Sequence, residues 1–206
     1  MSRSLPGLIV VLCGPSGAGK STLVARVEAA LPEVRFSVSY TTRPPRTGEV
    51  HGDDYFFVDL PEFERRAAAG EFLEHAVVHT NRYGTHRSQV EELAAQGGVV
   101  LLDIDVQGAA QVRAGGSDVV FVFVLPPTVQ ALEQRLRGRG TDADEVIARR
   151  LAVARSEMEQ AVLFDYAVVN DDLAAATEDL LAILRAERLR RDVQAAAARV
   201  GVAPAP

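Results

Sequence analysis

Near its start the chain reads Gly14-Pro15-Ser16-Gly17-Ala18-Gly19-Lys20-Ser21, which fits the pattern G-x-x-x-x-G-K-[ST]. The short apolar block 8–12 precedes this stretch and is typical of a fully buried strand. Apolar residues then recur at helical spacing until Pro32, at Leu23, Val24, Val27 and Leu31. This order of strand, glycine-rich loop and helix predicts a phosphate-binding loop, or P-loop, in an α/β fold.

The residue types in this loop have a physical reason. Glycines allow several backbone N–H groups to converge on phosphate oxygens, and the N-terminus of the following helix adds positive dipole. Lys20 is expected to reach the β- and γ-phosphates, and the hydroxyl of Ser21 to hold Mg²⁺. The sequence therefore predicts a binding site for a nucleoside triphosphate.

Composition limits the class of protein. The 206 residues suffice for one domain, with room for inserted lobes, and the 48% apolar and 24% charged contents are ordinary for a globular protein. A net charge of −6 argues against a general nucleic-acid or anionic-membrane surface. The single cysteine, Cys13, excludes an internal disulfide framework and a cysteine-rich metal site.

Hydropathy indicates the compartment. No segment approaches the roughly 20 apolar residues of a membrane span. The apolar block after residues 1–4 leads straight into the glycine-rich loop, which indicates a strand and not a signal peptide. We expect a cytoplasmic protein with no membrane partner and no nucleic-acid partner.

Three further apolar runs have the character of buried parallel strands, at 99–102, 119–124 and 166–169. Helical patterns separate or follow them, at 128–137, about 142–161, and 173 to about 198. This alternation predicts an α/β fold with a central parallel sheet flanked by helices.

Two segments differ from this core. Residues 37–96 hold short runs among turn signals, with three of the four tyrosines and all four histidines, and we interpret them as an inserted mixed α+β lobe. Residues 136–150 are rich in arginine and broken by Gly138 and Gly140, which predicts a small helical lid. The core would comprise residues 1–36, 97–135 and 151–190, and a frayed or disordered tail would occupy 191–206.

The inserted lobe carries candidate ligands for a nucleotide. Arg43 and Arg46 flank a Pro-Pro pair that holds the segment extended, and two guanidinium groups there suit a phosphate dianion. A solvated basic turn is the alternative. A buried carboxylate in the lobe would pair with the adjacent N1–H and N2–H₂ donors of guanine, whereas adenine would leave it unpaired. The other polar candidates in the lobe are Glu49, Tyr55, Glu74, Tyr83 and Thr85.

At this point the chain resembles the guanylate kinase family, and most of all its bacterial, cytoplasmic members. The likeness follows the family's motif order from about Gly7 to about Arg190. Its segments are 14–22 (GPSGAGKST), 37–49 (SVSYTTRPPRTGE), 70–74 (GEFLE), 83–85 (YGT), 103–108 (DIDVQG), 135–141 (RLRGRGT) and 169–172 (VNDD). The resemblance implies a P-loop NTPase core with an inserted GMP-binding lobe and a lid, and the reaction ATP + GMP ⇌ ADP + GDP, with dGMP as a further acceptor.

The resemblance also implies roles by position at the GMP end. The phosphate of GMP would be held by Arg43, Arg46, Glu49 and Tyr55, with Tyr83 beside it. The guanine would be read by Ser39, Glu74, Thr85 and Asp105.

At the ATP end the resemblance implies that Lys20 and the loop from Gly14 to Thr22 hold the phosphates. Mg²⁺ would be served by Ser21 and, through water, by Asp103. Asn170 would lie beside the adenine. The arginines that close over the transferring phosphoryl group would be Arg135, Arg139 and Arg150. Since two anions must meet, the offsetting charge is assigned to Lys20, Arg43, Arg135, Arg150 and Mg²⁺.

Two positions depart from the family pattern. His75 stands where a tryptophan is common, and Arg82 where a tyrosine is frequent. Neither has a role assigned to it, so the departures concern local packing. For His75 and His79 a packing or surface role is favoured over catalysis or metal binding.

Other functions remain as alternatives. Guanylate-kinase-like domains of scaffold proteins bind phosphopeptides without catalysis, but their P-loop is degraded, whereas this chain keeps Lys20 and Ser21. A P-loop kinase for another acceptor, or a plain NTPase, is the remaining alternative. The paired arginines disfavour an acceptor without phosphate, and Glu74 with Asp105 disfavours AMP. The sequence leaves the oligomeric state open.

Overall fold

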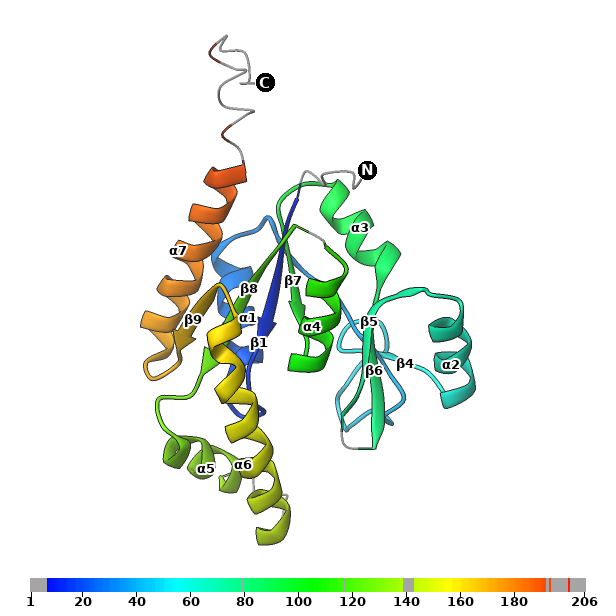
Figure 1. Ribbon diagram of the computed structural model, residues 1–206, viewed down its shortest axis with the longest axis vertical. Helices are drawn as coiled ribbons and strands as arrows, with labels where there is room; N and C mark the ends of the chain where they lie inside the picture. The colour runs from blue at the N-terminus through cyan, green and yellow to red at the C-terminus, as the bar shows by residue number, and fades with distance from the viewer. Residues whose placement is uncertain are drawn as a thin grey trace.

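The computed structural model describes residues 7–78, 80–116, 118–138, 143–191, 193 and 200. Its centre is a five-stranded, wholly parallel sheet in the order β2-β7-β1-β8-β9 (Figure 1). The strands are β1 (Leu8–Cys13), β2 (Val34–Phe36), β7 (Val99–Asp103), β8 (Val119–Leu125) and β9 (Tyr166–Val169). The predicted α/β fold with a central parallel sheet is confirmed.

Strand β1 is buried on both faces because its side chains alternate between two helical layers. Leu8, Val10 and Leu12 pack in a cluster with α1 (Lys20–Ala30) and α7 (Leu173–Arg191). Ile9 and Val11 pack in a second cluster with α3 (Arg87–Ala95) and α4 (Val106–Ala114). Burial on both faces explains the uninterrupted apolar run that the sequence shows there.

The register of the sheet sets the position of the glycine-rich loop. Leu12 of β1 pairs with Asp103, the last residue of β7, and Cys13 pairs with Phe123 of β8. The loop therefore leaves the sheet at the carboxyl ends of its strands, directly beside the Asp103 carboxylate. In open α/β sheets ligands bind in the crevice outside these strand ends.

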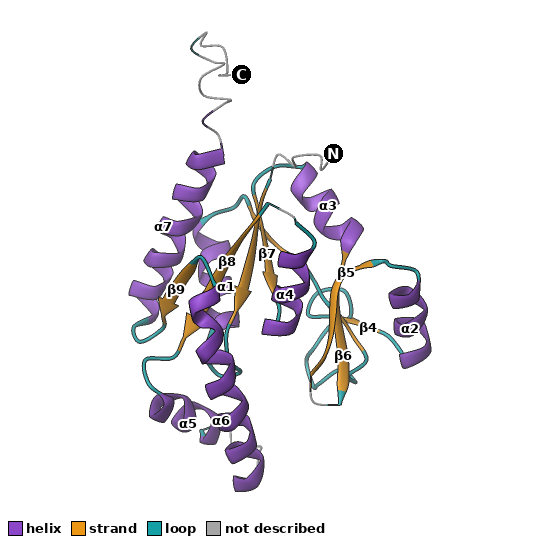
Figure 2. Ribbon diagram, viewed as in Figure 1, coloured by secondary structure: helices purple, strands orange, loops and turns teal. Residues whose placement is uncertain are grey.

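A second sheet of four strands lies beside the first, in the order β4-β3-β6-β5 (Figure 2). It consists of β3 (Tyr40–Thr41), β4 (Phe56–Phe57), β5 (Phe72–Val78) and β6 (Asn81–His86). Helix α2 (Leu60–Ala68) covers it, and the Phe63 ring of this helix stacks on Phe72 with 4.7 Å between centroids. Asp59 caps α2, because its Oδ1 accepts the N–H of Glu62 at 2.9 Å.

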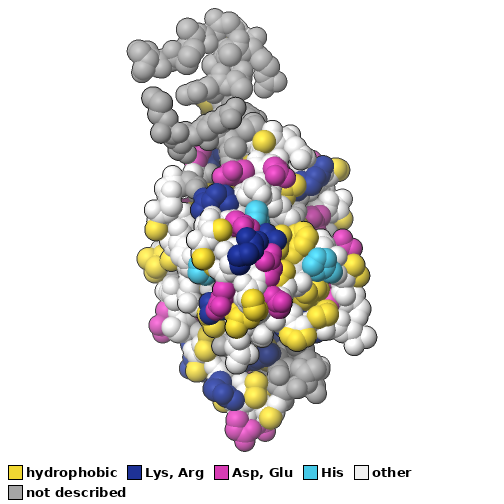
Figure 3. All heavy atoms as spheres, turned by 90° about the vertical axis from the view of Figure 1, so that its right-hand side faces the viewer, with side chains coloured by type: hydrophobic (Ala, Val, Ile, Leu, Met, Phe, Trp, Pro, Cys, Tyr) yellow, Lys and Arg dark blue, Asp and Glu magenta, His cyan; other side chains and the backbone are white. Residues whose placement is uncertain are grey.

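The outer face of α2 carries paired charges. Arg65 and Arg66 both contact Glu62 and Glu71, and His86 lies 3.4 Å from the Glu71 carboxylate. Figure 3 shows basic and acidic side chains intermingled on this side of the molecule. Glu71, the residue before β5, thus contacts both α2 and His86 at the end of β6.

Helices α5 (Val129–Arg137) and α6 (Asp144–Glu159) pack on each other below the parallel sheet (Figure 1). Their small core contains Leu132, Leu136, Ile147 and Ala154. A 3₁₀ turn, η1 (Gln160–Leu163), follows α6. The predicted lid boundaries at 135/136 and 150/151 fall within these helices, and residues 139–142 lie outside the described part. The division into core, lobe and lid stays a prediction.

The structure adds elements to those predicted. Strand β2 and helices α2, α3 and α4 were not identified from the sequence, whereas strands β1, β7, β8 and β9 and helices α1, α5, α6 and α7 were. Helix α7 is described to Arg191, so most of the predicted tail lies outside the described residues. No helix in the described ranges is long and apolar enough to cross a membrane.

Candidate active site

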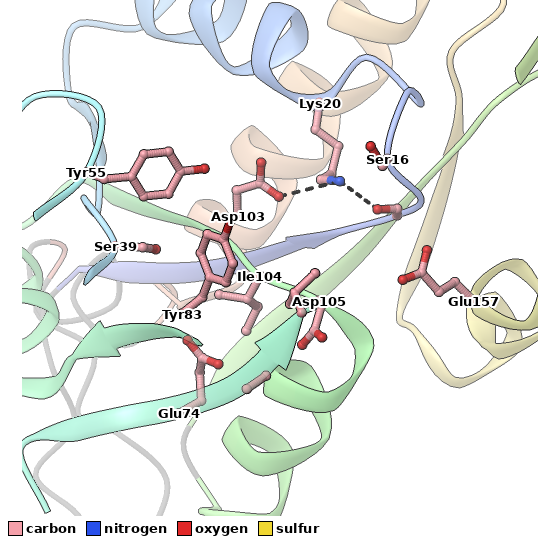
Figure 4. A pocket seen from close by; sticks show the side chains of 13 residues that line it. Ser16, Lys20, Ser39, Tyr55, Glu74, Tyr83, Asp103, Ile104, Asp105 and Glu157 are labelled. Atoms are coloured by element: carbon pink, nitrogen blue, oxygen red, sulfur yellow. Dashed lines mark hydrogen bonds and ion pairs between the residues drawn. The ribbon is translucent and has the colours of Figure 1, made fainter. Parts of the chain in front are cut away.

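A cavity of about 270 Å³ lies between the glycine-rich loop and the four-stranded sheet (Figure 4). Gly14, Ser16 and Lys20 line it at one end, and Glu74 and Asp105 at the other. The remaining predicted site residues on its walls are Ser39, Tyr55, Tyr83 and Asp103. Residues predicted for a triphosphate and residues predicted for guanine thus share one cavity.

The glycine-rich loop ends in an open helix N-terminus. Helix α1 begins at Lys20, with Gly19 as its N-cap residue and no side-chain cap in the described part of the chain. Ser21 and Thr22, in the first turn, are exposed. The first N–H groups of a helix have no partner within the helix, so they are available to an anion.

Two contacts hold Lys20 inside the cavity. Its Nζ donates to the carbonyl oxygen of Gly14 at 2.6 Å and lies 3.6 Å from Oδ1 of Asp103 (Figure 4). Burial raises the pKa of the Asp103 carboxyl, and the nearby Lys20 charge partly offsets this rise. The ammonium group is therefore positioned between the loop and the end of β7.

At the other end of the cavity stands a buried carboxyl group. The Glu74 side chain lies on β5, is 4% exposed, and accepts a hydrogen bond from Oγ1 of Thr85 at 2.6 Å. Burial raises the pKa of Glu74 to about 7, and the nearby Asp105 charge adds to the rise. The site thus contains a carboxylate that is costly to ionise without a partner, which suits a ligand with paired N–H donors.

Two residues of α4 shape the surroundings of Glu74. Asp105 is the N-cap of this helix, and its Oδ1 accepts the N–H of Gly108 at 2.8 Å. A Cβ atom on Gly108 would lie 2.3 Å from Oε2 of Glu74. Gly108 is therefore a site residue that sequence reasoning did not single out, although a glycine at the third position of a helix was an available signal.

Arg43 and Glu49 form a bidentate ion pair within the segment that connects β3 and β4. The two guanidinium nitrogens of Arg43 donate to the two carboxylate oxygens of Glu49 at 2.8 and 2.9 Å. Oε2 of Glu49 also accepts the backbone N–H of Arg46 at 2.7 Å. These bonds lower the pKa of Glu49 and raise that of Arg43, whose guanidinium also lies 5.3 Å from the Tyr55 ring centroid. Glu49 thus aligns Arg43 in this conformation.

Other predicted site residues do not line the cavity. Among the described residues, Arg135 and Asn170 contact the backbone of the glycine-rich loop, and Arg150 is half-buried on α6. Arg139 lies outside the described residues. The remaining predicted residues without a place in the lining are Pro15, Gly17, Ala18, Gly19, Ser21, Thr22, Arg43, Arg46, Glu49 and Thr85. Their assigned roles toward nucleotides stay predictions.

Glu157 lines the cavity and was missed by sequence reasoning. It projects from α6 toward the glycine-rich loop (Figure 4), and burial raises its pKa while the charge of Lys20 lowers it. Glu157 follows Arg150 by seven residues, so the two lie on one face of the helix. That spacing was the available signal.

The two residues that depart from the family pattern make contacts with other residues of the chain. The backbone N–H and carbonyl of His75 bond to the Gln111 side chain at 3.2 and 2.8 Å, and Arg82 pairs with Glu64 at 2.9 Å. His79 lies outside the described residues. The His75 ring lies 6.3 Å from the Phe63 ring and 6.2 Å from the Phe72 ring, and a packing role for the two residues stays a prediction.

The residues present fit Mg²⁺ bound together with a nucleotide. The described residues contain no group of three or more His, Cys, Asp and Glu side chains that could hold a metal ion. Mg²⁺ usually keeps several waters and takes one or two carboxylates together with substrate phosphates. The Asp103 carboxylate and the Ser21 hydroxyl are hard oxygen ligands of this kind beside the loop.

Comparisons with known proteins identify the family of the chain. The family model described as guanylate kinase matches residues 7–187. Guanylate kinases of Neisseria meningitidis serogroup A and Symbiobacterium thermophilum are 54% and 52% identical to this chain. These matches cover 94% and 92% of this chain and 95% and 90% of the relatives. A crystal structure of guanylate kinase from Anaplasma phagocytophilum superposes with a TM-score of 0.72 at 36% identity, over 89% of this chain and 87% of that one. The chain therefore belongs to the guanylate kinase family.

Proposed function

We propose that the cavity between the P-loop and Glu74 is where ATP donates its γ-phosphoryl group to GMP, giving ADP and GDP. The observation that supports this proposal is the placement of Lys20 and Glu74 at opposite ends of one cavity. Membership in the guanylate kinase family supports the identity of both substrates. dGMP is included as an acceptor because no assigned contact involves the 2′-hydroxyl.

At the ATP end the N-terminus of α1 and the P-loop amides would bind the phosphates, with Lys20 between the β- and γ-groups. Ser21 and, through water, Asp103 would hold Mg²⁺, which neutralises charge on the β- and γ-phosphate oxygens. Lys20 and Asp103 lie 3.6 Å apart, so they would serve the phosphates and the metal ion from neighbouring positions.

At the GMP end the Glu74 carboxylate would accept the N1–H and N2–H₂ donors of guanine, with Ser39 and Asp105 nearby. Thr85 already occupies one side of Oε1 and fixes the carboxylate plane. The GMP phosphate would be held by Arg43, Arg46, Tyr55 and Tyr83. Glu49, which holds Arg43 by two bonds, would keep its guanidinium in place for the phosphate.

The transfer needs little covalent chemistry from the protein. A phosphate oxygen of GMP attacks the γ-phosphorus, the bond to the β–γ bridging oxygen breaks, and ADP leaves with those electrons. The acceptor is already an anion, so no general base is required. The protein must align two anions and offset their repulsion, which we assign to Lys20, Arg43, Arg135 and Arg150 together with Mg²⁺.

The proposal includes the separate roles that the sequence predicts for the inserted lobe and the lid. Residues 37–96 would serve as the GMP-binding lobe and 136–150 as a lid that excludes water, since an open site would hydrolyse ATP. The separate small core between α5 and α6 supports a lid built on these helices. A cytoplasmic location belongs to the same proposal.

The test is a comparison of acceptors. ADP release from ATP and Mg²⁺ is measured in a coupled assay with GMP, dGMP, AMP, UMP and CMP. We expect turnover with GMP and dGMP, and little with AMP because it lacks the donors that Glu74 requires. Faster turnover with AMP would favour another monophosphate kinase. ADP release that is independent of any acceptor would favour an NTPase. If no ADP is released with any acceptor, a non-catalytic binding module would be favoured.

A further inference from the structure

The carbonyl oxygen of Ala18, in the middle of the P-loop, is held by two side chains from distant parts of the chain. Nδ2 of Asn170 donates to it at 2.8 Å, and a guanidinium nitrogen of Arg135 at 3.4 Å. Ala18 is fully buried and the Asn170 side chain nearly so, with 5% of that residue exposed. One N–H of the Asn170 amide is thus committed to the loop backbone.

Asn170 is itself fixed by backbone bonds. Its N–H donates to the carbonyl of Leu125, at the end of β8, at 2.8 Å. Its own carbonyl accepts the second guanidinium nitrogen of Arg135 at 2.9 Å. Arg135 therefore bridges the carbonyls of Ala18 and Asn170 and ties α5 to the loop that follows β9.

The fit at Gly19 shows how closely Asn170 packs on the P-loop. A Cβ atom at Gly19 would lie 2.4 Å from Nδ2 of Asn170, and Gly19 has a φ of +92°. Glycine is required here both for the backbone conformation and for the close approach of the amide.

Planarity of the peptide gives this contact a consequence for phosphate binding. In a trans peptide the carbonyl oxygen and the following N–H point in opposite directions. Asn170 and Arg135 hold the Ala18 oxygen on one side, so the Gly19 N–H is directed to the other side of the loop. Since a P-loop binds phosphate through such N–H groups, the orientation of this one peptide affects triphosphate affinity.

We propose that Asn170 is a positioning residue that sets the P-loop for the triphosphate, and that Arg135 shares this role by bridging the two carbonyls. Asn170 then contributes to ATP binding through Ala18 and Gly19. This inference rests on the proposed ATP site at the P-loop.

The test separates the triphosphate from the base. Dissociation constants for ATP, inorganic tripolyphosphate and GMP are measured by calorimetry on the full chain for wild type, Asn170→Ala and the isosteric Asn170→Asp. We expect Asn170→Ala to weaken the binding of ATP and of tripolyphosphate by the same factor, about tenfold for the loss of one buried hydrogen bond. GMP affinity stays within twofold, and KM for ATP rises more than kcat falls. Asn170→Asp, which places a carboxylate against the Ala18 carbonyl, weakens both further.

The matched control is Asp171→Ala, an exposed neighbour, which should leave all three constants unchanged. Weakened ATP with unchanged tripolyphosphate would overturn the proposal and assign Asn170 to the adenine. Parallel loss of GMP affinity in both variants would also overturn it, since that pattern indicates a general scaffold role. If Asn170→Ala does not fold, the three dissociation constants of Asn170→Asp alone test the proposal. Wild-type protein that fails to bind tripolyphosphate would instead refute the proposed ATP site.

Discussion

Under the proposed function, the two ends of the cavity would recognise their substrates by different means. At the P-loop the proposed binding groups are backbone N–H donors of the loop and of the N-terminus of α1, with Lys20 as the charged side chain inside the cavity. At the guanine end the key group is a buried, titratable side chain, Glu74, held by Thr85 and given room by Gly108. Backbone donors do not titrate near neutral pH, whereas a buried carboxyl does. We therefore expect the ATP end to depend on geometry and the GMP end to depend on protonation.

The largest expected effect is at the P-loop. Lys20→Ala should lower kcat by about 10²–10³-fold or more, because the ammonium charge acts mainly in the transition state. GMP affinity should stay near wild type, since Lys20 stands at the far end of the cavity from Glu74. Turnover is measured by coupled ADP release, and GMP binding by calorimetry.

The control for this variant is Arg26→Ala, which removes an exposed cation from the same helix and should leave turnover unchanged. A wild-type kcat in Lys20→Ala would remove the basis for placing phosphoryl transfer at this loop.

The next effect is at the other end of the cavity. Glu74→Gln keeps the shape but presents one N–H₂ group to the two guanine donors, so kcat/KM for GMP should fall by about 10²-fold. ATP affinity should change little. Steady-state kinetics with each substrate varied in turn measures both, and Glu91→Gln, an exposed site on α3, is the matched control. An unchanged KM for GMP would show that Glu74 does not read the base.

The smallest effect follows from the pKa of Glu74, which burial raises from 4.5 to about 7. Between these values the folded free protein keeps a proton that the unfolded chain loses, so this group's contribution to stability declines as the pH rises through the window. GMP affinity should change in the opposite sense, falling by up to about tenfold per unit as the pH drops below 7.

Thermal unfolding of the free protein and GMP titration, each from pH 5.5 to 8, measure the two trends. The phosphate of GMP also titrates near pH 6, but Glu74→Gln retains that titration and lacks the carboxyl group. The difference between wild type and this variant therefore isolates Glu74. Identical pH profiles in the two proteins would contradict the assignment.

Sequence alone predicted much of the core because its signals are local. The P-loop pattern and the apolar runs of the parallel sheet each occupy consecutive residues, and the strands lie where those runs are. Strand β2 has only three residues, Val34–Phe36, and its place in the sheet depends on pairing with β7. A run that short carries no periodicity from which to identify it.

The site was less predictable because its contacts join distant residues. Glu157 lies beside the P-loop only through the packing of α6, and Gly108 matters only because Glu74 lies against it. The hydrogen bond between Asn170 and Ala18 spans 152 positions. Family resemblance could indicate which residues belong to the site, but not that the Asn170 amide is bonded to the loop backbone.

Lys20 is also the only lysine in the chain, since every other strongly basic side chain is arginine. Arginine stays protonated and does not react with acylating reagents at neutral pH, so Lys20 offers the one side-chain amine of the protein. That amine lies in the cavity, donates to Gly14, and would be covered by the phosphates of a bound nucleotide. Because bound donor nucleotide would block acylation at this position, the fraction of Lys20 that stays unlabelled would count occupied sites directly.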